Sequence, residues 1–240
     1  MIYRGRQGDI VFEFSVSPAS RATIILCDGL PSVPKQRQVM DLLQAKGYNV
    51  FFPRYRGTWE SGGNFLAQSP ALDILELVAL IKSGSVTELY SNQKFSTNPR
   101  LYLVGSSWGA TVALSLADNP DVARVIAFSP IVDFVSHQQN SQGQNLQWLK
   151  QFIRRAFYQG YRFEDKDWER MLSGELFKPS LKLKPETTTI VYDRSDEEIS
   201  STDIETYCQI GGATAVQVTG IGHLSFSKIP PELWDQVLVG

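Results

Sequence analysis

A serine with a glycine two positions away on either side lies near the middle of the chain. The segment GSSWG at 105–109 fits the pattern G-x-S-x-G, with Ser107 at its centre. The apolar run 101–105 leads into it and a helix-like run, 110–117, leads out, so Ser107 is expected at a sharp turn between a strand and a helix. Small residues let that strand and helix approach closely, and the N–H groups at the helix start can face developing negative charge. The pattern predicts a nucleophile elbow with Ser107 as the nucleophile.

A serine hydroxyl needs a general base, and the chain contains two histidines. His223 lies in the loop GIGH, 220–223, after the last predicted strand, from which it can reach the C-terminal edge of a sheet. His137 lies at the start of a helical segment. The acid of a triad is expected in the loop after the preceding strand, and position alone leaves four candidates open there: Asp193, Asp196, Glu197 and Glu198.

Apolar strand-like runs alternate with helix-like runs along most of the chain, which is typical of βαβ units and a parallel sheet. We therefore expect one α/β domain over 1–240, with a mostly parallel eight-stranded sheet and helices on both faces. The predicted strands are 2–6, 9–16, 22–27, 49–53, 101–105, 123–129, 187–193 and 214–218, the first two forming a hairpin. The predicted helices are 34–43, 71–82, 110–117, 203–208 and 231–237.

The alternation breaks between about 134 and 184, where the chain is polar and aromatic and looks helical. We interpret this segment as a helical lid inserted into the domain. Its aromatic residues could line an acyl pocket, or could merely seat the lid helices on the sheet. They are Phe134, Trp148, Phe152, Phe157, Tyr158, Tyr161, Phe163, Trp168 and Phe177.

Composition excludes several other classes of function. The 23 basic and 25 acidic residues give a formal net charge of −2, which offers nothing to a phosphate backbone or an anionic membrane. Cys27 and Cys208 have neither zinc-site nor disulfide-framework spacing, and Cys27 is expected to be a small apolar core residue. No signal peptide or membrane span is apparent, so a cytoplasmic protein without metal or cofactor is expected. The sequence leaves the oligomeric state open.

These features together resemble the α/β-hydrolase superfamily of serine hydrolases, whose triad follows the order Ser, acid, His. The dienelactone-hydrolase and prolyl-oligopeptidase-like branch is the nearest in pattern. There the penultimate strand is followed by Gly-x-x-Asp, and the Asp is the triad acid. Asp193 stands at the Gly position here, so the resemblance implies Asp196 as the acid. A minority of the superfamily places the acid after the sixth strand, where Asp133 stands.

The resemblance extends to two loops. The family's His-Gly after the third strand corresponds to Asp28-Gly29, which implies that the backbone N–H groups of Leu30 and Trp108 form the oxyanion hole. The segment RGTWESG, 56–62, resembles the family's Arg-Gly-x-x-x-Ser loop, and within it Arg56 and Glu60 are interpreted as an ion pair.

The expected function is therefore hydrolysis of an acyl bond in a small-molecule substrate, as a carboxylesterase or thioesterase does. Ser107 would form an acyl-enzyme, His223 would transfer the proton, and Asp196 would hold the imidazole tautomer. One alternative is a serine peptidase of the prolyl-oligopeptidase-like kind. A second is a noncatalytic binding protein on a hydrolase scaffold.

Overall fold

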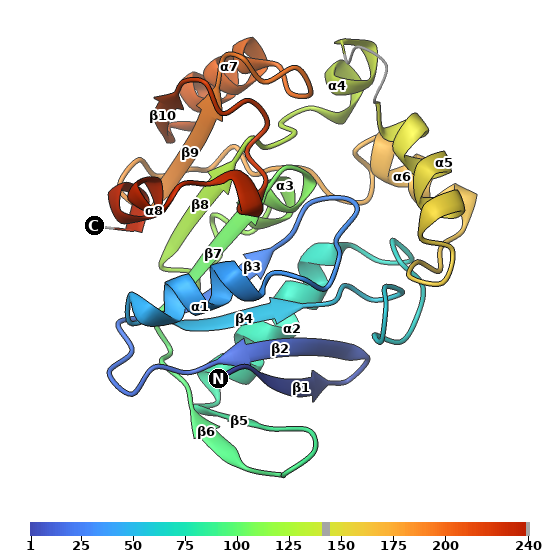
Figure 1. The fold of residues 1–240 in the computed structure, drawn as a ribbon. Helices are drawn as coiled ribbons and strands as arrows, with labels where there is room; N and C mark the ends of the chain where they lie inside the picture. The colour runs from blue at the N-terminus through green and yellow to red at the C-terminus, as the bar shows by residue number, and fades with distance from the viewer. Residues whose placement is uncertain (141–144, 239–240) are drawn as a thin grey trace.

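An eight-stranded sheet runs through the structure, a computed structural model that describes residues 1–140 and 145–238 (Figure 1). Residues 141–144 of the predicted insertion and 239–240 of the predicted domain lie outside the described residues. The strand order is β1-β2-β4-β3-β7-β8-β9-β10, with β2 antiparallel to β1 and β4 and the remaining pairs parallel. This confirms the predicted mostly parallel eight-stranded sheet. The strands are β1 (Tyr3–Gln7), β2 (Ile10–Ser15), β3 (Thr23–Cys27), β4 (Asn49–Pro53), β7 (Leu101–Ser106), β8 (Arg124–Phe128), β9 (Thr188–Asp193) and β10 (Thr214–Val218).

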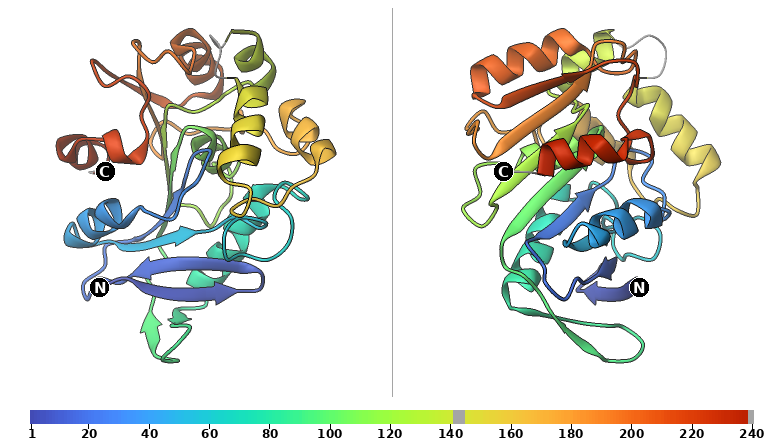
Figure 2. Two further views of the ribbon diagram at one scale, coloured as in Figure 1. Left: turned by 45° about the vertical axis from the view of Figure 1, so that its right-hand side comes forward. Right: turned by 60° about the vertical axis from the view of Figure 1, so that its left-hand side comes forward.

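Helices cover both faces of the sheet, as the sequence indicates (Figures 1 and 2). One apolar cluster contains side chains of α1, η1 and α8, and the other contains side chains of α2, α3 and α7. Every residue of β3 and β7 is buried, which is typical of central parallel strands covered on both faces. The helices are α1 (Arg37–Ala45), α2 (Pro70–Lys82), α3 (Trp108–Leu114), α7 (Ser201–Gly211), η1 (Phe226–Lys228) and α8 (Pro231–Leu238).

Several helix ends differ from the sequence expectation by up to about three residues, and one small hairpin was not expected. Helix α1 begins at Arg37 rather than near residue 34. A small hairpin of β5 (Ser85–Thr87) and β6 (Lys94–Ser96) stands apart from the main sheet and was not predicted. Its three-residue strands are too short to show apolar alternation, and the hairpin is fixed by a long-range contact between the rings of Phe95 and Tyr3, with centroids 4.2 Å apart.

The inserted segment folds as helices α4 (Phe134–Asn140), α5 (Leu146–Ala156) and α6 (Asp165–Leu172). Its described part contains no strand, and it meets the sheet domain through an isolated bridge between Thr58 and Tyr161. Figure 1 shows α5 and α6 at the side toward which β4 points, and Figure 2 shows the same helices set apart from the sheet layers. Among the residues described, no helix combines the length and apolar character needed to span a membrane.

Candidate active site

Ser107 occupies a sharp turn between β7 and α3. Its backbone angles, φ 55° and ψ −129°, lie outside the regions that a non-glycine residue ordinarily adopts. A Cβ atom on Gly105 would stand 2.5 Å from Ala110 Cα, and one on Gly109 would stand 2.1 Å from the carbonyl oxygen of Cys27. Both glycines are therefore required by close backbone approach, and the turn has the geometry of a nucleophile elbow.

His223 bonds to one of the four candidate carboxylates. Its Nδ1 lies 3.0 Å from Asp196 Oδ2, while Asp196 Oδ1 accepts hydrogen bonds from the N–H groups of Glu198 and Ile199. Burial raises the pKa of Asp196, but the hydrogen bond to His223 and the imidazole charge outweigh it, so the pKa lies below its ordinary value. Asp196 thus faces the imidazole as a carboxylate, in the arrangement that fixes a histidine tautomer.

Asp193 holds the backbone that precedes His223. Its Oδ2 accepts hydrogen bonds from the N–H groups of Ile221 (2.7 Å) and Gly222 (3.0 Å), and its Oδ1 accepts from the N–H and hydroxyl of Ser195. Burial acts to raise the pKa of this carboxyl, but these hydrogen bonds lower it to about 2. Asp193 is therefore a structural anion at the end of β9.

Asp133, the remaining alternative, lies at the start of α4. Its Oδ1 accepts hydrogen bonds from the N–H groups of Val135 (2.8 Å) and Ser136 (3.0 Å). It satisfies the first turn of that helix, as N-terminal aspartates commonly do.

The Ser107 hydroxyl and the His223 ring lack a mutual hydrogen bond among the described residues. His223 Nε2 instead lies 3.7 Å from Glu198 Oε2. Glu198 and His137, but not His223, line the cavity into which Ser107 opens. The second histidine therefore belongs to the surroundings of Ser107, a position that could not be predicted from the sequence.

The Ser107 cavity has a volume of about 240 Å³ and a largely apolar wall. Of the nine aromatic residues in the insertion, Trp148 and Phe152 line it, stacked with ring centroids 5.2 Å apart. Phe134, Tyr161, Trp168 and Phe177 are buried in the core instead. The cavity lining is Leu30, Pro31, Ser107, Trp108, Ile131, His137, Leu146, Trp148, Leu149, Phe152, Glu198 and Ile199.

The two residues expected to supply the oxyanion hole, Leu30 and Trp108, both line this cavity. Within the described chain, neither backbone N–H donates a hydrogen bond. The adjoining loop lies against the nucleophile, because a Cβ on Gly29 would stand 3.1 Å from Ser107 Cβ. The two expected oxyanion donors therefore have no competing hydrogen bond among the described residues.

Asp28 organises the start of that loop. Its carboxylate accepts hydrogen bonds from Gly29 N–H (3.0 Å), Ser32 Oγ (3.2 Å) and Gln36 Nε2 (3.0 Å). Burial raises the pKa of Asp28 to about 6, against the opposing effect of these hydrogen bonds. The loop at the position of the expected His-Gly pair is therefore anchored by these three hydrogen bonds of Asp28.

Two aromatic side chains, those of Tyr161 and Trp59, bond to the main chain of Ser32. The Tyr161 hydroxyl accepts a hydrogen bond from Ser32 N–H (2.6 Å) and donates to its carbonyl oxygen (3.2 Å). Trp59 Nε1 donates to the same carbonyl at 2.8 Å. Tyr161 comes from the insertion, so the insertion and the loop containing Leu30 are mechanically linked.

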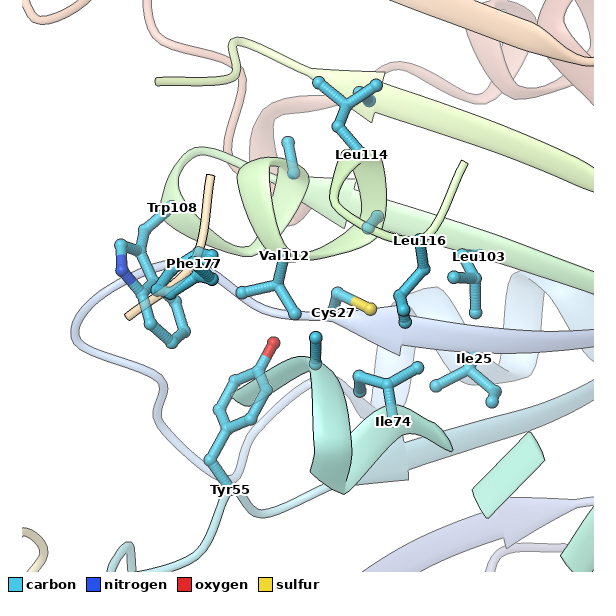
Figure 3. Packing of buried hydrophobic residues seen from close by; sticks show 14 of the residues in the cluster. Ile25, Cys27, Tyr55, Ile74, Leu103, Trp108, Val112, Leu114, Leu116 and Phe177 are labelled. Atoms are coloured by element: carbon cyan, nitrogen blue, oxygen red, sulfur yellow. The ribbon is translucent and has the colours of Figure 1, made fainter. Parts of the chain in front are cut away.

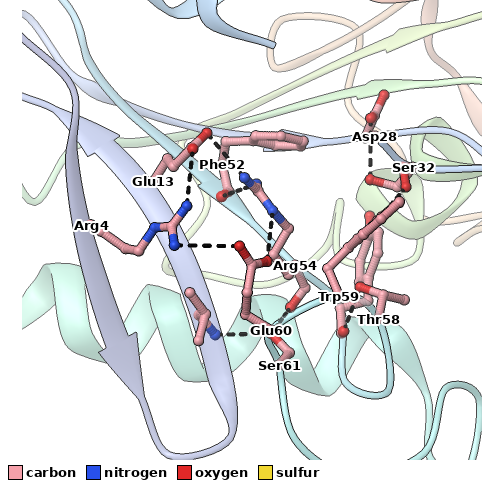
Figure 4. Close-up of polar contacts among 12 residues, drawn as sticks. Arg4, Glu13, Asp28, Ser32, Phe52, Arg54, Thr58, Trp59, Glu60 and Ser61 are labelled. Carbon is pink, nitrogen blue, oxygen red and sulfur yellow. Dashed lines mark hydrogen bonds and ion pairs between the residues drawn. The ribbon is translucent and has the colours of Figure 1, made fainter. Parts of the chain in front are cut away.

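The loop after β4 does not contain the expected Arg56–Glu60 pair. Arg56 pairs instead with Asp73 and Glu76 on α2, because its side chain points toward that helix. Glu60 lies 3.3 Å from Arg4 and 3.8 Å from the buried Arg54 (Figure 4). The loop is held by ion pairs with β1 and α2 and by the Arg54–Glu60 pair within it.

Ser106 and Ser129 hold the loop that carries His223, a role that sequence reasoning missed. Ser106 Oγ donates to the carbonyl oxygen of Leu224 (3.1 Å), and Ser129 Oγ accepts from the N–H of Leu224 (3.2 Å). A hydrogen bond from Ser129 also helps to lower the pKa of Asp196. Neither serine has a distinctive sequence context; positive φ at Ser129 (44°) is visible only in the structure.

A cluster of buried hydrophobic side chains packs around Trp108 and α3, directly after the elbow (Figure 3). The rings of Tyr55 and Phe177 meet Trp108 edge-on at 5.2 and 5.5 Å. Cys27 is fully buried in the same cluster, and burial raises the pKa of its thiol, so it is a packing residue as expected. The described residues contain no group of three or more His, Cys, Asp or Glu side chains arranged to hold a metal ion.

No protein-family model matches the chain, and no curated protein matches it in sequence. Solved structures are similar to it. The esterase Pf2001 of Pyrococcus furiosus is 19% identical with a TM-score of 0.63, over 99% of this chain and 89% of that one. The α/β hydrolase GrgF of Penicillium sp. sh18 is 16% identical with a TM-score of 0.72, over 99% and 96%. Est1E of Butyrivibrio proteoclasticus, solved with ferulic acid bound, is 15% identical with a TM-score of 0.66, over 98% and 95%. The chain therefore has the α/β-hydrolase fold, which confirms the resemblance at the level of fold and leaves the branch unspecified.

Proposed function

We propose that this protein is a serine hydrolase that cleaves an acyl bond in a small-molecule substrate, as a carboxylesterase or thioesterase does. The observation that carries the proposal is the geometry of Ser107. A strained serine between two obligatory glycines, at the start of a helix and facing a cavity, is the arrangement that exposes a nucleophilic hydroxyl. The similar structure of Pf2001, which is described as an esterase, is consistent with this assignment.

In the proposed reaction, Ser107 Oγ attacks the acyl carbonyl carbon and His223 Nε2 accepts the hydroxyl proton. The N–H groups of Leu30 and Trp108 stabilise the oxyanion, and the imidazolium then protonates the departing alcohol or thiol. Water releases the acyl group by the same steps. Asp196 holds the imidazole through its 3.0 Å contact with Nδ1. The remaining hydrogen bond, from Ser107 Oγ to His223 Nε2, would form when substrate binds, because catalytic hydrogen bonds often tighten only in the complex with substrate.

We propose further that the helices of segment 134–184 act as a lid. Trp148 and Phe152 of α5 line the cavity beside Ser107, where they would contact the acyl chain. The loop that suggested a peptidase is engaged in ion pairs with α2 and β1, so no specific contact favours that alternative.

A fluorophosphonate probe with peptide mapping tests the proposal. The probe should label Ser107, and Ser107→Ala should lose both labelling and turnover of p-nitrophenyl esters, because only an activated hydroxyl beside oxyanion donors reacts readily. An adduct on another residue, or none on folded protein, would contradict the assignment and favour a binding protein. Faster cleavage of aminoacyl-naphthylamides than of esters would favour the peptidase.

The same assays distinguish the roles of the two histidines. His223→Ala is expected to lower kcat by about 10³-fold or more, because it removes the base that Asp196 orients. His137→Gln should act mainly through KM, because His137 lines the cavity but has no carboxylate hydrogen-bonded to its ring among the described residues. Equal losses of kcat in the two variants would contradict the choice of His223.

A further inference from the structure

A second cavity adjoins the one that contains Ser107. Its volume is about 410 Å³, within the range of small-molecule sites. Ile131, His137, Glu198 and Ile199 line both cavities. The two spaces therefore adjoin at these four residues.

The charge of this second cavity is strongly one-sided. Its ionisable lining consists of His137 and five carboxylates, and no Lys or Arg lines it in the described chain: the carboxylates are Asp133, Asp196, Glu197, Glu198 and Asp203. Their arrangement is fixed in part, since Asp196 faces His223 and Asp203 Oδ2 accepts a hydrogen bond from Ser136 Oγ. Carboxylates are ionised at neutral pH unless their surroundings oppose it, so the cavity presents negative potential.

His137 lies where the two cavities adjoin. The residue is only 9% exposed, and its ring nitrogens form no hydrogen bond with any described residue. Burial lowers the pKa of His137 and the neighbouring His223 lowers it further, against the opposing effect of Asp196 and Asp203. A neutral imidazole offers one acceptor nitrogen. His137 can therefore accept a hydrogen bond from a donor bound between the two cavities.

The Ser107 cavity has the opposite character. Its wall includes Leu146, Leu149, Trp148 and Phe152, which suit an aliphatic or aromatic chain. A substrate that fits both spaces would be apolar near Ser107 and carry a positively charged hydrogen-bond donor beyond His137.

We propose that the acidic cavity binds a protonated primary amine of the substrate, so that the preferred acyl substrate carries an ammonium group on one side of the scissile carbonyl. This inference rests on the proposed function, because it assumes that Ser107 holds the scissile bond. An ammonium group has three N–H donors and no acceptor, and matches a set of carboxylates with a neutral imidazole. A carboxylate or phosphate in the same place would be repelled.

Binding to the Ser107→Ala variant tests the inference without turnover. Isothermal titration calorimetry would compare two pairs of esters in which a methyl group replaces the ammonium: ethyl ε-aminocaproate with ethyl heptanoate, and ω-aminopentyl acetate with hexyl acetate. The first pair places the charge on the acyl side and the second on the leaving-group side. In at least one pair the ammonium ester should bind about tenfold more tightly than its neutral analogue, as a charge-assisted contact allows.

Charge-removing variants locate the contact. In the Ser107→Ala background, Asp203→Asn should reduce the ammonium preference by about fivefold, because it removes one charge and leaves an oxygen for Ser136. Glu197→Gln should also reduce the ammonium preference. Because Glu197 is exposed, this substitution should have little effect on folding. Glu205→Gln is the matched control, since Glu205 lies on the same helix α7 but pairs with Arg194 outside the cavity. It should leave the preference as it is.

The outcomes separate the two proposals. Equal dissociation constants within each pair, tighter binding of both neutral esters, or an ammonium preference retained in an Asp203→Asn/Glu197→Gln variant would overturn the amine site. If wild-type protein is then still labelled at Ser107 and still cleaves ethyl heptanoate, the proposed hydrolase function stands without it. If labelling and turnover fail while Ser107→Ala retains a cavity-dependent ammonium preference, the hydrolase proposal fails and the amine site stands.

Discussion

Asp193 Oδ2 accepts a hydrogen bond of 3.0 Å from the N–H of Gly222, and so fixes the backbone one residue before His223. Asp196, which follows three positions later in the chain, contacts the imidazole itself at 3.0 Å. Two carboxylates from one turn thus contact adjacent parts of the same loop: Asp193 bonds to its main chain, and Asp196 bonds to the imidazole ring of His223. They should therefore differ in what their substitution changes.

Asp196→Asn is expected to reduce kcat by at least about 10²-fold with the fold retained, because an amide can present a donor where the imidazole requires an acceptor and favours the wrong tautomer. Steady-state ester hydrolysis, with circular dichroism to establish folding, measures the effect. Asp121→Asn is a suitable control, because Asp121 forms an exposed ion pair with Lys82. A crippled Asp133→Asn variant beside an active Asp196→Asn variant would place the acid at the start of α4.

Asp193→Asn should act on stability more than on chemistry. The carboxylate accepts four hydrogen bonds, and an amide can satisfy only part of them, so a loss of about 2 kcal/mol in the free energy of unfolding is expected at pH 7. The pKa of Asp193 is lowered to about 2, so its stabilisation is present above the ordinary aspartate range and disappears as the pH falls toward 2. Urea unfolding of both proteins between pH 7 and pH 2 should show their difference shrinking on acidification. A difference that grows on acidification would contradict this account.

Asp28→Asn should have the opposite effect on stability and increase the free energy of unfolding at neutral pH. Because burial raises the pKa of Asp28 from 3.8 to about 6, the wild-type protein should lose stability as the pH rises from about 4 to about 6. Asparagine keeps an acceptor for Gly29 N–H and carries no charge. The variant should therefore be more stable than wild type by about 1 kcal/mol or more at pH 7, and similar to it near pH 4. Thermal unfolding across this range measures the change, and a variant less stable at pH 7 would show that the ionised carboxylate is needed.

Trp148 and Phe152 should control which acyl chains are accepted. They are 43% and 37% exposed, so replacing either with Ala should cost little stability, but both line the Ser107 cavity. Each variant should shift the optimum of a p-nitrophenyl ester series toward longer or bulkier acyl groups. Tyr158→Ala is the control, because Tyr158 is more exposed (69%) and does not line that cavity. An unchanged chain-length profile in both cavity variants would mean that these aromatics only support the insertion.

The sequence alone determined the features of the fold that depend on neighbouring residues. Strand β10 was predicted with the bounds that the structure has, and the elbow was predicted because strand, turn and helix are consecutive in the chain. The glycines on either side of Ser107 are also explained in part by neighbouring residues, because α3 begins directly after Ser107 and packs closely on the strand that precedes it. Apolar runs such as 101–105 need burial on both faces wherever they occur, so they predict the central strands well.

Only the tertiary structure decided how the polar groups around the elbow are paired. Asp193 and Asp196 lie three residues apart in one turn. The direction of each side chain depends on the loop that packs against this turn, here residues 220–223 near the end of the chain. The position of His137 beside Ser107, and of Tyr161 on Ser32, depends on how the insertion packs over the sheet. Apolar burial leaves a periodic trace in the sequence because many residues contribute to it together. A polar contact between two distant residues leaves no such pattern, because it depends on the positions and orientations of two side chains that only the folded chain brings together.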